Sequence, residues 1–193
     1  MMRSTAIVFF FSFVVAACQQ RVDYTAQIAQ LDKAMLDIDS AKKVFEALPL
    51  DSAGALYSSV KEDMSAIQKK YRGEMPKNRA YLLSRYRDIP NNVKGFSQER
   101  KAIEKEFELG AEQLRNLREA LAAGADVDGK GNKIDQVYVE KYSAEELKFA
   151  TALVQKVEQV KFGLERSFDD YKEIYPSLAV FIDSVKTLDE PVE

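Results

Sequence analysis

Hydrophobic residues recur every three to four positions through most of this chain, and polar residues fill the positions between them. This spacing puts the apolar side chains on one face of a helix, which is typical of amphipathic α-helices packed against a core. The pattern predicts four longer helices, over residues 28–48, 56–71, 103–121 and 147–175.

Prolines, glycines and capping residues give the predicted limits of the first two helices. Pro49 ends the first helix, because proline cannot continue it. Asp51 or Ser52 can cap the second helix at its N-terminus. Gly73 and Pro76 follow the second helix and close it.

A shorter helix is predicted over residues 77–88, followed by a loop over residues 89–95 that is dense in helix breakers. Ser97 can cap the helix behind this loop. Gly124 is placed as the residue that follows the end of that helix.

Residues 134–142 fit either a strand or a helix, and we expect a short helix because no second strand is available for pairing. The sequence from Ser143 to Glu146 matches a capping box, which predicts that the longest helix begins there. Pro176 is expected to interrupt this helix, with a last short helix over residues 178–185.

The longest helix carries two adjacent apolar stripes, so it contacts more than one partner helix. We therefore expect an all-α fold, an elongated antiparallel helical bundle of about four longer helices plus short terminal helices. Residues 23–188 form one domain, and residues 189–193 are expected to fray.

The first residues follow a different pattern, with Arg3 before an unbroken apolar run from Ala6 to Ala17. This run is shorter than the ~20 residues that a spanning helix needs, and it is typical of a secretory signal. It ends Val15-Ala16-Ala17-Cys18, which resembles the lipobox of bacterial lipoproteins. The resemblance implies that residues 1–17 are a lipoprotein signal peptide, that cleavage precedes Cys18, and that Cys18 becomes lipidated.

The same resemblance suggests where the protein is located. Gln19 is not the aspartate that commonly retains lipoproteins in the inner membrane, which favours the outer membrane. No acidic cluster follows Cys18, which favours the side facing the periplasm. Residues 18–22 would form a short lipidated tether, so the sequence leaves anionic lipid head groups within reach of the domain.

The composition restricts the chemistry. Hydrophobic residues make up 46% of the chain and charged residues 31%, which fits a folded domain. The sequence has no histidine, the commonest general base near neutral pH and the commonest zinc ligand, and its single cysteine is assigned to the anchor. We predict no catalytic residue, no metal and no cofactor, and therefore no enzyme.

One loop has part of the spacing of a calcium site. Counting from Asp126, Asp128 and Gly131 fit positions three and six of an EF-hand loop. Lys130 and Val137 stand where the loop needs oxygen ligands. We therefore interpret residues 126–133 as a solvent-exposed turn between helices.

Basic residues gather in the middle of the chain, where ten Lys and Arg face three acidic residues between Lys69 and Lys101. An envelope protein or anionic head groups could bind such a patch, whereas the leader argues against nucleic acid. Alternatively, these cations pair with acidic helices of the same bundle. The candidate patch consists of Lys69, Lys70, Arg72, Lys77, Arg79, Arg85 and Arg87.

Lys161 falls on the apolar face of the longest helix. A lysine at such a position usually extends its ammonium group to the rim, and otherwise it is buried with a partner.

Two functional hypotheses remain. The first is a lipid-anchored envelope protein with a non-enzymatic binding or scaffolding role. The alternative is a carrier or sensor of a small apolar ligand, held within the bundle by Phe149, Phe168, Tyr171 and Tyr175. An interior cavity would favour the carrier, and a packed seam would favour the binding or scaffolding protein.

Overall fold

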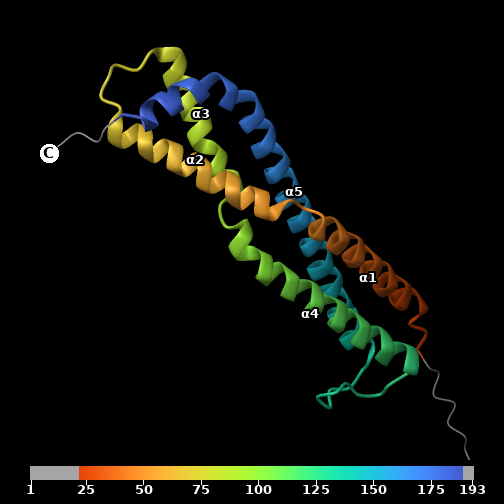
Figure 1. The fold of residues 1–193 in the computed structure, drawn as a ribbon. Helices are drawn as coiled ribbons and strands as arrows, with labels where there is room; N and C mark the ends of the chain where they lie inside the picture. Colours follow the sequence, from red (N-terminus) through yellow and green to blue (C-terminus); the bar gives the residue numbers. More distant parts are fainter. Residues whose placement is uncertain (1–21, 189–193) are drawn as a thin grey trace, which may run out of the picture.

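The computed structural model describes residues 22–188, apart from the side chains of residues 92 and 96–98. Within that range it contains five α-helices and no strand beyond an isolated bridge between Val127 and Lys133 (Figure 1). The predicted all-α helical bundle is therefore confirmed. The predicted signal peptide, Cys18 and the predicted tail at residues 189–193 lie outside the described residues. The helices are α1 (Thr25–Glu46), α2 (Leu50–Lys70), α3 (Lys77–Val93), α4 (Phe96–Ala123) and α5 (Gln136–Lys186).

Helix α5 runs through the whole molecule. It has 51 residues, which corresponds to about 77 Å of helix at ~1.5 Å per residue. Figure 1 shows that α1 and then α2 follow α5 in the same direction, whereas α3 and α4 run back. Two successive helices thus cover the length that α5 covers alone.

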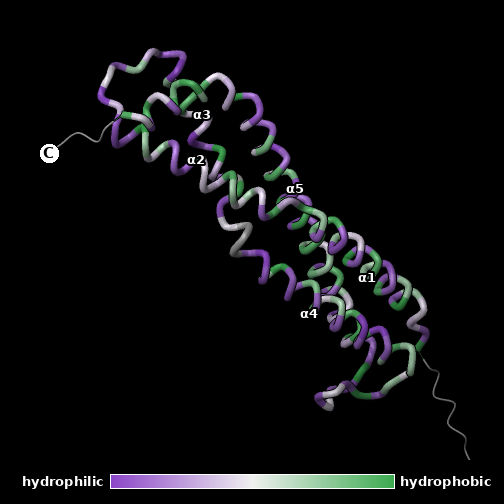
Figure 2. The backbone as a smooth tube through the Cα atoms, viewed as in Figure 1, coloured by the Kyte–Doolittle hydropathy of each residue, from purple (hydrophilic) through white to green (hydrophobic). Residues whose placement is uncertain are grey.

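The helices form two three-helix lobes that share α5. The proximal lobe contains α1, α4 and the first part of α5, around a core that includes Leu31, Phe107 and Val157. The distal lobe contains α2, α3 and the last part of α5, around Val60, Tyr86 and Leu178. Hydrophobic and hydrophilic residues alternate around each helix (Figure 2), as two separate cores along one spine require.

The lobes meet where both short connections lie. Residues 47–49 join α1 to α2, and Lys94 and Gly95 join α3 to α4. Gly95 has a φ of 94°, a conformation that glycine adopts without steric cost. An Arg100–Asp51 ion pair of 3.7 Å links the start of α4 to the start of α2.

Helix α3 is longer than its sequence predicts, because the expected loop over residues 89–95 is wrong. The helix continues through Pro90 to Val93. Ile89 and Val93 are buried, with 1% and 5% of their surface exposed. Their burial offsets the hydrogen bond that Pro90 cannot donate.

The predicted limits of α5 are wrong at both ends. Residues 136–142 are helical, as expected, but they belong to α5, so Ser143 is inside the helix and does not cap it. Asp135 caps it instead, and its Oδ1 accepts a hydrogen bond of 3.0 Å from the Tyr138 N–H. Pro176 is also inside α5, which bends in its C-terminal, blue part (Figure 1). Ile174 and Leu178, buried on either side of Pro176, hold the two parts in one core.

Two further predicted N-caps are wrong. Asp51 and Ser52 lie inside α2, which follows Pro49, and Ser97 lies inside α4, which follows Gly95. The fixed φ of proline and the positive φ of glycine begin these helices without a side-chain cap. Gly124 follows α4 with a φ of 64°, as predicted.

Candidate functional site

The N-terminal end of the described chain lies at the outer end of the proximal lobe. Val22 and Tyr24 line a surface hollow together with Gly124, Ala125 and Ile134. The hollow therefore includes residues from both ends of the α4–α5 loop. A tether that precedes Val22 would leave the molecule at this end.

The structure brings all seven predicted basic residues into the distal lobe. Lys69 and Lys70 end α2, Arg72 lies in the α2–α3 connection, and the other four lie on α3. Lys70 contacts the last residue of α5, so the end of α2 and Val22 are at opposite ends of the α5 spine.

Three of the seven basic side chains contact α5, a different helix from the segment that carries them. Lys70 Nζ donates to the carbonyl oxygens of Lys186 and Leu188, at 2.9 and 2.8 Å, at the C-terminus of α5. The Arg79 guanidinium lies 4.5 Å from the centre of the Phe181 ring. These contacts favour the intramolecular interpretation for both residues.

Arg85 is the third. Its guanidinium donates to Glu173 at 2.8 Å and to Asp170 at 3.2 Å, which joins α3 to α5. The hydrogen bond that Arg85 donates to Glu173 raises the pKa of Arg85, and the same contact lowers the pKa of Glu173. Charge reversal at Arg85 would therefore disturb the fold as well as the surface.

The remaining four, Lys69, Arg72, Lys77 and Arg87, are exposed. Arg72 donates one hydrogen bond of 3.2 Å to the Gln68 carbonyl at the end of α2. Arg87 also forms a weak 3.8 Å pair with its neighbour Asp88, about 15 Å along α3 from Lys77. We call Lys69, Arg72 and Lys77 the distal basic surface. Tyr81, 64% exposed and one helical turn from Lys77, adjoins it, and Glu74 is its acidic neighbour in the connection.

A buried polar cluster lies inside the distal lobe. Asp63 has only 2% of its surface exposed. Its Oδ2 accepts a 2.6 Å hydrogen bond from the Tyr86 hydroxyl, and its Oδ1 lies 2.5 Å from Lys186 Nζ. Burial and the hydrogen bond to Asp63 raise the pKa of Tyr86, and the hydrogen bond to Asp63 raises the pKa of Lys186.

This cluster links α2, α3 and α5, because Asp63 of α2 bonds to Tyr86 of α3 and to Lys186 of α5. Sequence reasoning missed it, although Asp63 stands on the apolar stripe between Val60 and Ile67. The lysine singled out from the sequence was Lys161, which is half-buried. Within the described residues Lys161 makes no ion pair. The lysine that pairs with the buried Asp63 is Lys186, whose own side chain is 39% exposed.

The aromatic residues of the predicted ligand seam pack against protein. Tyr171 stacks on Tyr175 with ring centres 4.8 Å apart, and both lie within 6.2 Å of Tyr86. Phe149 packs against α4 at Gly110. Phe168 packs against both cores and also lines an open surface hollow with Pro49. These contacts fill the seam.

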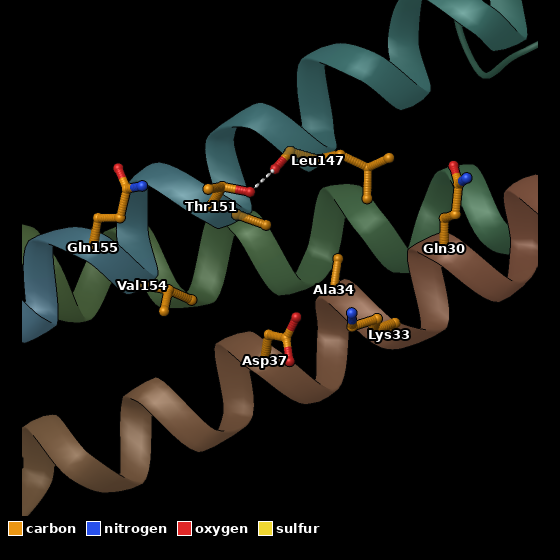
Figure 3. Close-up of a pocket in the computed structure, with 9 residues that line it drawn as sticks. Gln30, Lys33, Ala34, Asp37, Leu147, Thr151, Val154 and Gln155 are labelled. Atoms are coloured by element: carbon orange, nitrogen blue, oxygen red, sulfur yellow. Dashed lines mark hydrogen bonds between the residues drawn. The ribbon is translucent and has the colours of Figure 1, made fainter.

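A shallow groove of about 310 Å³ follows α1 and α5 on the proximal lobe (Figure 3). Gln30, Lys33 and Asp37 line it from α1, and Thr151 and Gln155 line it from α5. The Thr151 hydroxyl donates to the Leu147 carbonyl at 2.8 Å. The groove is a surface feature, and it is not lined by the four aromatic residues of the predicted seam.

The loop between α4 and α5 is organised by Asp128. Its two carboxylate oxygens accept hydrogen bonds of 2.8–3.0 Å from the Lys130 and Asn132 N–H groups, the Asn132 amide and the Tyr138 hydroxyl. These bonds, led by that from the Asn132 amide, lower the pKa of Asp128 to about 2. Both oxygens already bind donors of the protein, which supports interpreting this loop as a turn.

Comparison with protein-family models, with curated protein sequences and with solved structures gives no match. Over residues 22–188, no helix combines the length and apolar character needed to cross a bilayer. The same residues contain no group of three His, Cys, Asp or Glu side chains suited to a metal ion. The functional argument therefore depends on the fold and on the surfaces described above.

Proposed function

We propose that this protein is a lipid-anchored, non-enzymatic binding or scaffolding protein of a bacterial cell envelope. Cys18 would hold it in the outer membrane on the side that faces the periplasm. The distal basic surface would bind an acidic face of another envelope protein. The lipobox-like sequence before Cys18 is the basis for the anchor.

One structural observation carries the proposal about the binding end. Val22 and the distal basic surface lie at opposite ends of α5, which corresponds to about 77 Å of helix. An upright molecule would therefore hold Lys69, Arg72 and Lys77 far from the bilayer that contains its own anchor. This distance favours an envelope protein over the anionic head groups of that bilayer.

The packing of the aromatic seam favours this function over a carrier of apolar ligands. Tyr86, Tyr171 and Tyr175 contact one another, and Phe149 fills the space beside Gly110. A ligand within the bundle would have to displace these contacts.

The anchor is tested with Cys18→Ala in cells that export the protein. We expect the variant to leave the membrane fraction, and we expect the wild type to carry acyl chains at its N-terminus by mass spectrometry. Membrane retention of a properly exported Cys18→Ala variant would contradict the anchor.

The binding end is tested by crosslinking in intact cells with Lys69, Arg72 and Lys77 all changed to glutamate. A matched control reverses Lys33, Lys105 and Lys148, three exposed lysines of the proximal lobe. We expect a specific crosslinked partner to be lost in the distal variant and retained in the control. An unchanged pattern in a distal variant with wild-type circular dichroism would overturn the role of this surface.

A further inference from the structure

A second hollow lies at the other end of the molecule, between α4, the α4–α5 loop and the start of α5. We call it the loop-end groove, and it encloses about 380 Å³. Ligand pockets typically occupy about 300–1,000 Å³, so this groove suits a small ligand. It is separate from the distal basic surface.

The loop that forms one wall of the groove is held in shape before any ligand binds. Asp128, which lines the groove, fixes the loop through its bonds to Asn132 and to the Tyr138 hydroxyl. The bridge between Val127 and Lys133 joins the two arms of the loop. A preformed wall lowers the conformational entropy that the protein would lose on binding a ligand.

Tyrosine rings form another part of the lining, together with apolar side chains. Tyr138 and Tyr142 both line the groove, and their ring centres are 4.2 Å apart. Leu117 from α4 and Ile134 from the loop complete its apolar part. This arrangement offers an apolar surface to the C–H face of a ring-shaped ligand.

The rim carries groups that both donate and accept hydrogen bonds. Gln113 and Asn116 reach the groove from α4 with exposed carboxamides. Glu146 is half-buried at the α5 side, where burial, and secondarily the neighbouring Glu145, raises its pKa. A carboxylate in this position gains from ligand groups that donate hydrogen bonds.

From these features we propose that the loop-end groove binds a small neutral saccharide. Hydroxyl groups donate and accept at the same atom, which matches the carboxamides of Gln113 and Asn116 and the carboxylate of Glu146. The charge of Asp128 is already met by protein donors, and Lys130 and Glu146 carry opposite charges. The lining therefore does not select a strongly charged ligand.

The test uses the full lipidated chain, purified in a detergent that has no sugar head group, and saturation-transfer NMR. The probes are glucose, galactose and N-acetylglucosamine, with glycerol as a polyol without a ring. We expect magnetisation transfer to the ring C–H protons of at least one sugar and none to glycerol. Absence of transfer to all three sugars would overturn the proposal.

Three variants locate the binding. Tyr142→Ala removes part of the aromatic wall, whereas Asn116→Ala and Glu146→Gln change the rim and leave the core intact. Each should weaken sugar binding about tenfold, equivalent to about 1.4 kcal/mol, while Tyr81→Ala in the distal lobe leaves binding unchanged. Equal binding by all of these variants, or binding of tyramine in place of every sugar, would show that the saccharide assignment is wrong.

Discussion

At the scale of single residues, Asp63 makes the most consequential polar contacts described. It is the only charged side chain among the described residues that is buried, and it bonds to a tyrosine of α3 and a lysine of α5. A buried carboxylate is costly unless it is paired and hydrogen-bonded, and here both conditions are met.

Replacing Asp63 with asparagine should therefore destabilise the protein. We expect Asp63→Asn to lower the free energy of unfolding by about 2 kcal/mol, because Lys186 and Tyr86 lose a charged acceptor. Urea denaturation followed by circular dichroism measures the change. Asp183→Asn, at an exposed aspartate of α5, is the control and should stay within about 0.5 kcal/mol of the wild type.

The same cluster gives the variant a distinct pH dependence. The pKa of Lys186 is raised above 10.5, so its contribution is complete below that pH and is lost as the pH rises through the folded-state pKa. The pKa of Tyr86 is raised above 10.0, so its contribution to stability is also lost as the pH rises through the folded-state pKa. Stability should fall less steeply above about pH 10 in Asp63→Asn, and equal slopes would contradict this account.

At the scale of elements, the close approach of α4 to its neighbours depends on Gly110. A Cβ at this position would lie 2.7 Å from Phe149 Cε1 and 3.3 Å from Ile38 Cδ1. Gly54 in α2 has nothing within 4 Å of the same position. Substituting these two helical glycines by alanine therefore distinguishes the effect of helix propensity on stability from the effect of packing.

Alanine at these two positions should have opposite effects. We expect Gly54→Ala to raise the free energy of unfolding by about 1 kcal/mol, since alanine favours the helix. Gly110→Ala should lower it by about 1 kcal/mol, because overpacking outweighs the same gain. Thermal and urea unfolding measure both, and stabilisation by Gly110→Ala would show that Phe149 moves aside at no cost.

How far the sequence predicts the structure also differs from element to element. The helices themselves follow from apolar periodicity, which reports burial on one face. Their limits at Val93 and through Pro176 do not, because tertiary packing of Ile89 and Leu178 outweighs a local break. Ser143 matches a capping pattern, yet the helix is capped by Asp135, eight residues earlier in the chain.

The candidate sites show the same division. The basic residues are visible in the sequence, but only the fold separates exposed Lys77 from Arg85, which pairs with α5. The loop-end groove combines residues 113–120 of α4 with residues 127–146 of the loop and α5. These segments are separate in the sequence, so no local pattern predicts the groove. Asp63 could have been found from its polar character on an apolar stripe.

At the scale of the whole molecule, two cores of unequal size share α5. Among the residues that the structure describes, the proximal core has twenty buried residues and the distal core has ten, so less apolar burial supports the distal lobe. The lobes are joined by α5, by two short connections and by the Arg100–Asp51 pair. Local opening should therefore begin in the distal lobe.

Native-state hydrogen exchange tests this difference. We expect backbone amides of α2 and α3 to exchange through openings of lower free energy than those of α1 and α4. Within α5, protection should fall from the proximal part to the distal part. Uniform opening energies across all five helices would show that α5 makes the two lobes a single cooperative unit.

The unbroken course of α5 beside the α1–α2 connection has a mechanical consequence. In a molecule tethered before Val22, a pull on the distal basic surface would travel through the backbone of α2, across residues 47–49, and into α1. That joint is a short non-helical connection held by a few local backbone hydrogen bonds, such as the 2.8 Å bond from the Leu50 N–H to the Leu48 carbonyl, whereas α5 passes it without interruption and packs against both helices. Helix α5 thus supports the connection between α1 and α2 against stretching. The connection lengthens only if α1 or α2 slides along α5 and loses its packing there.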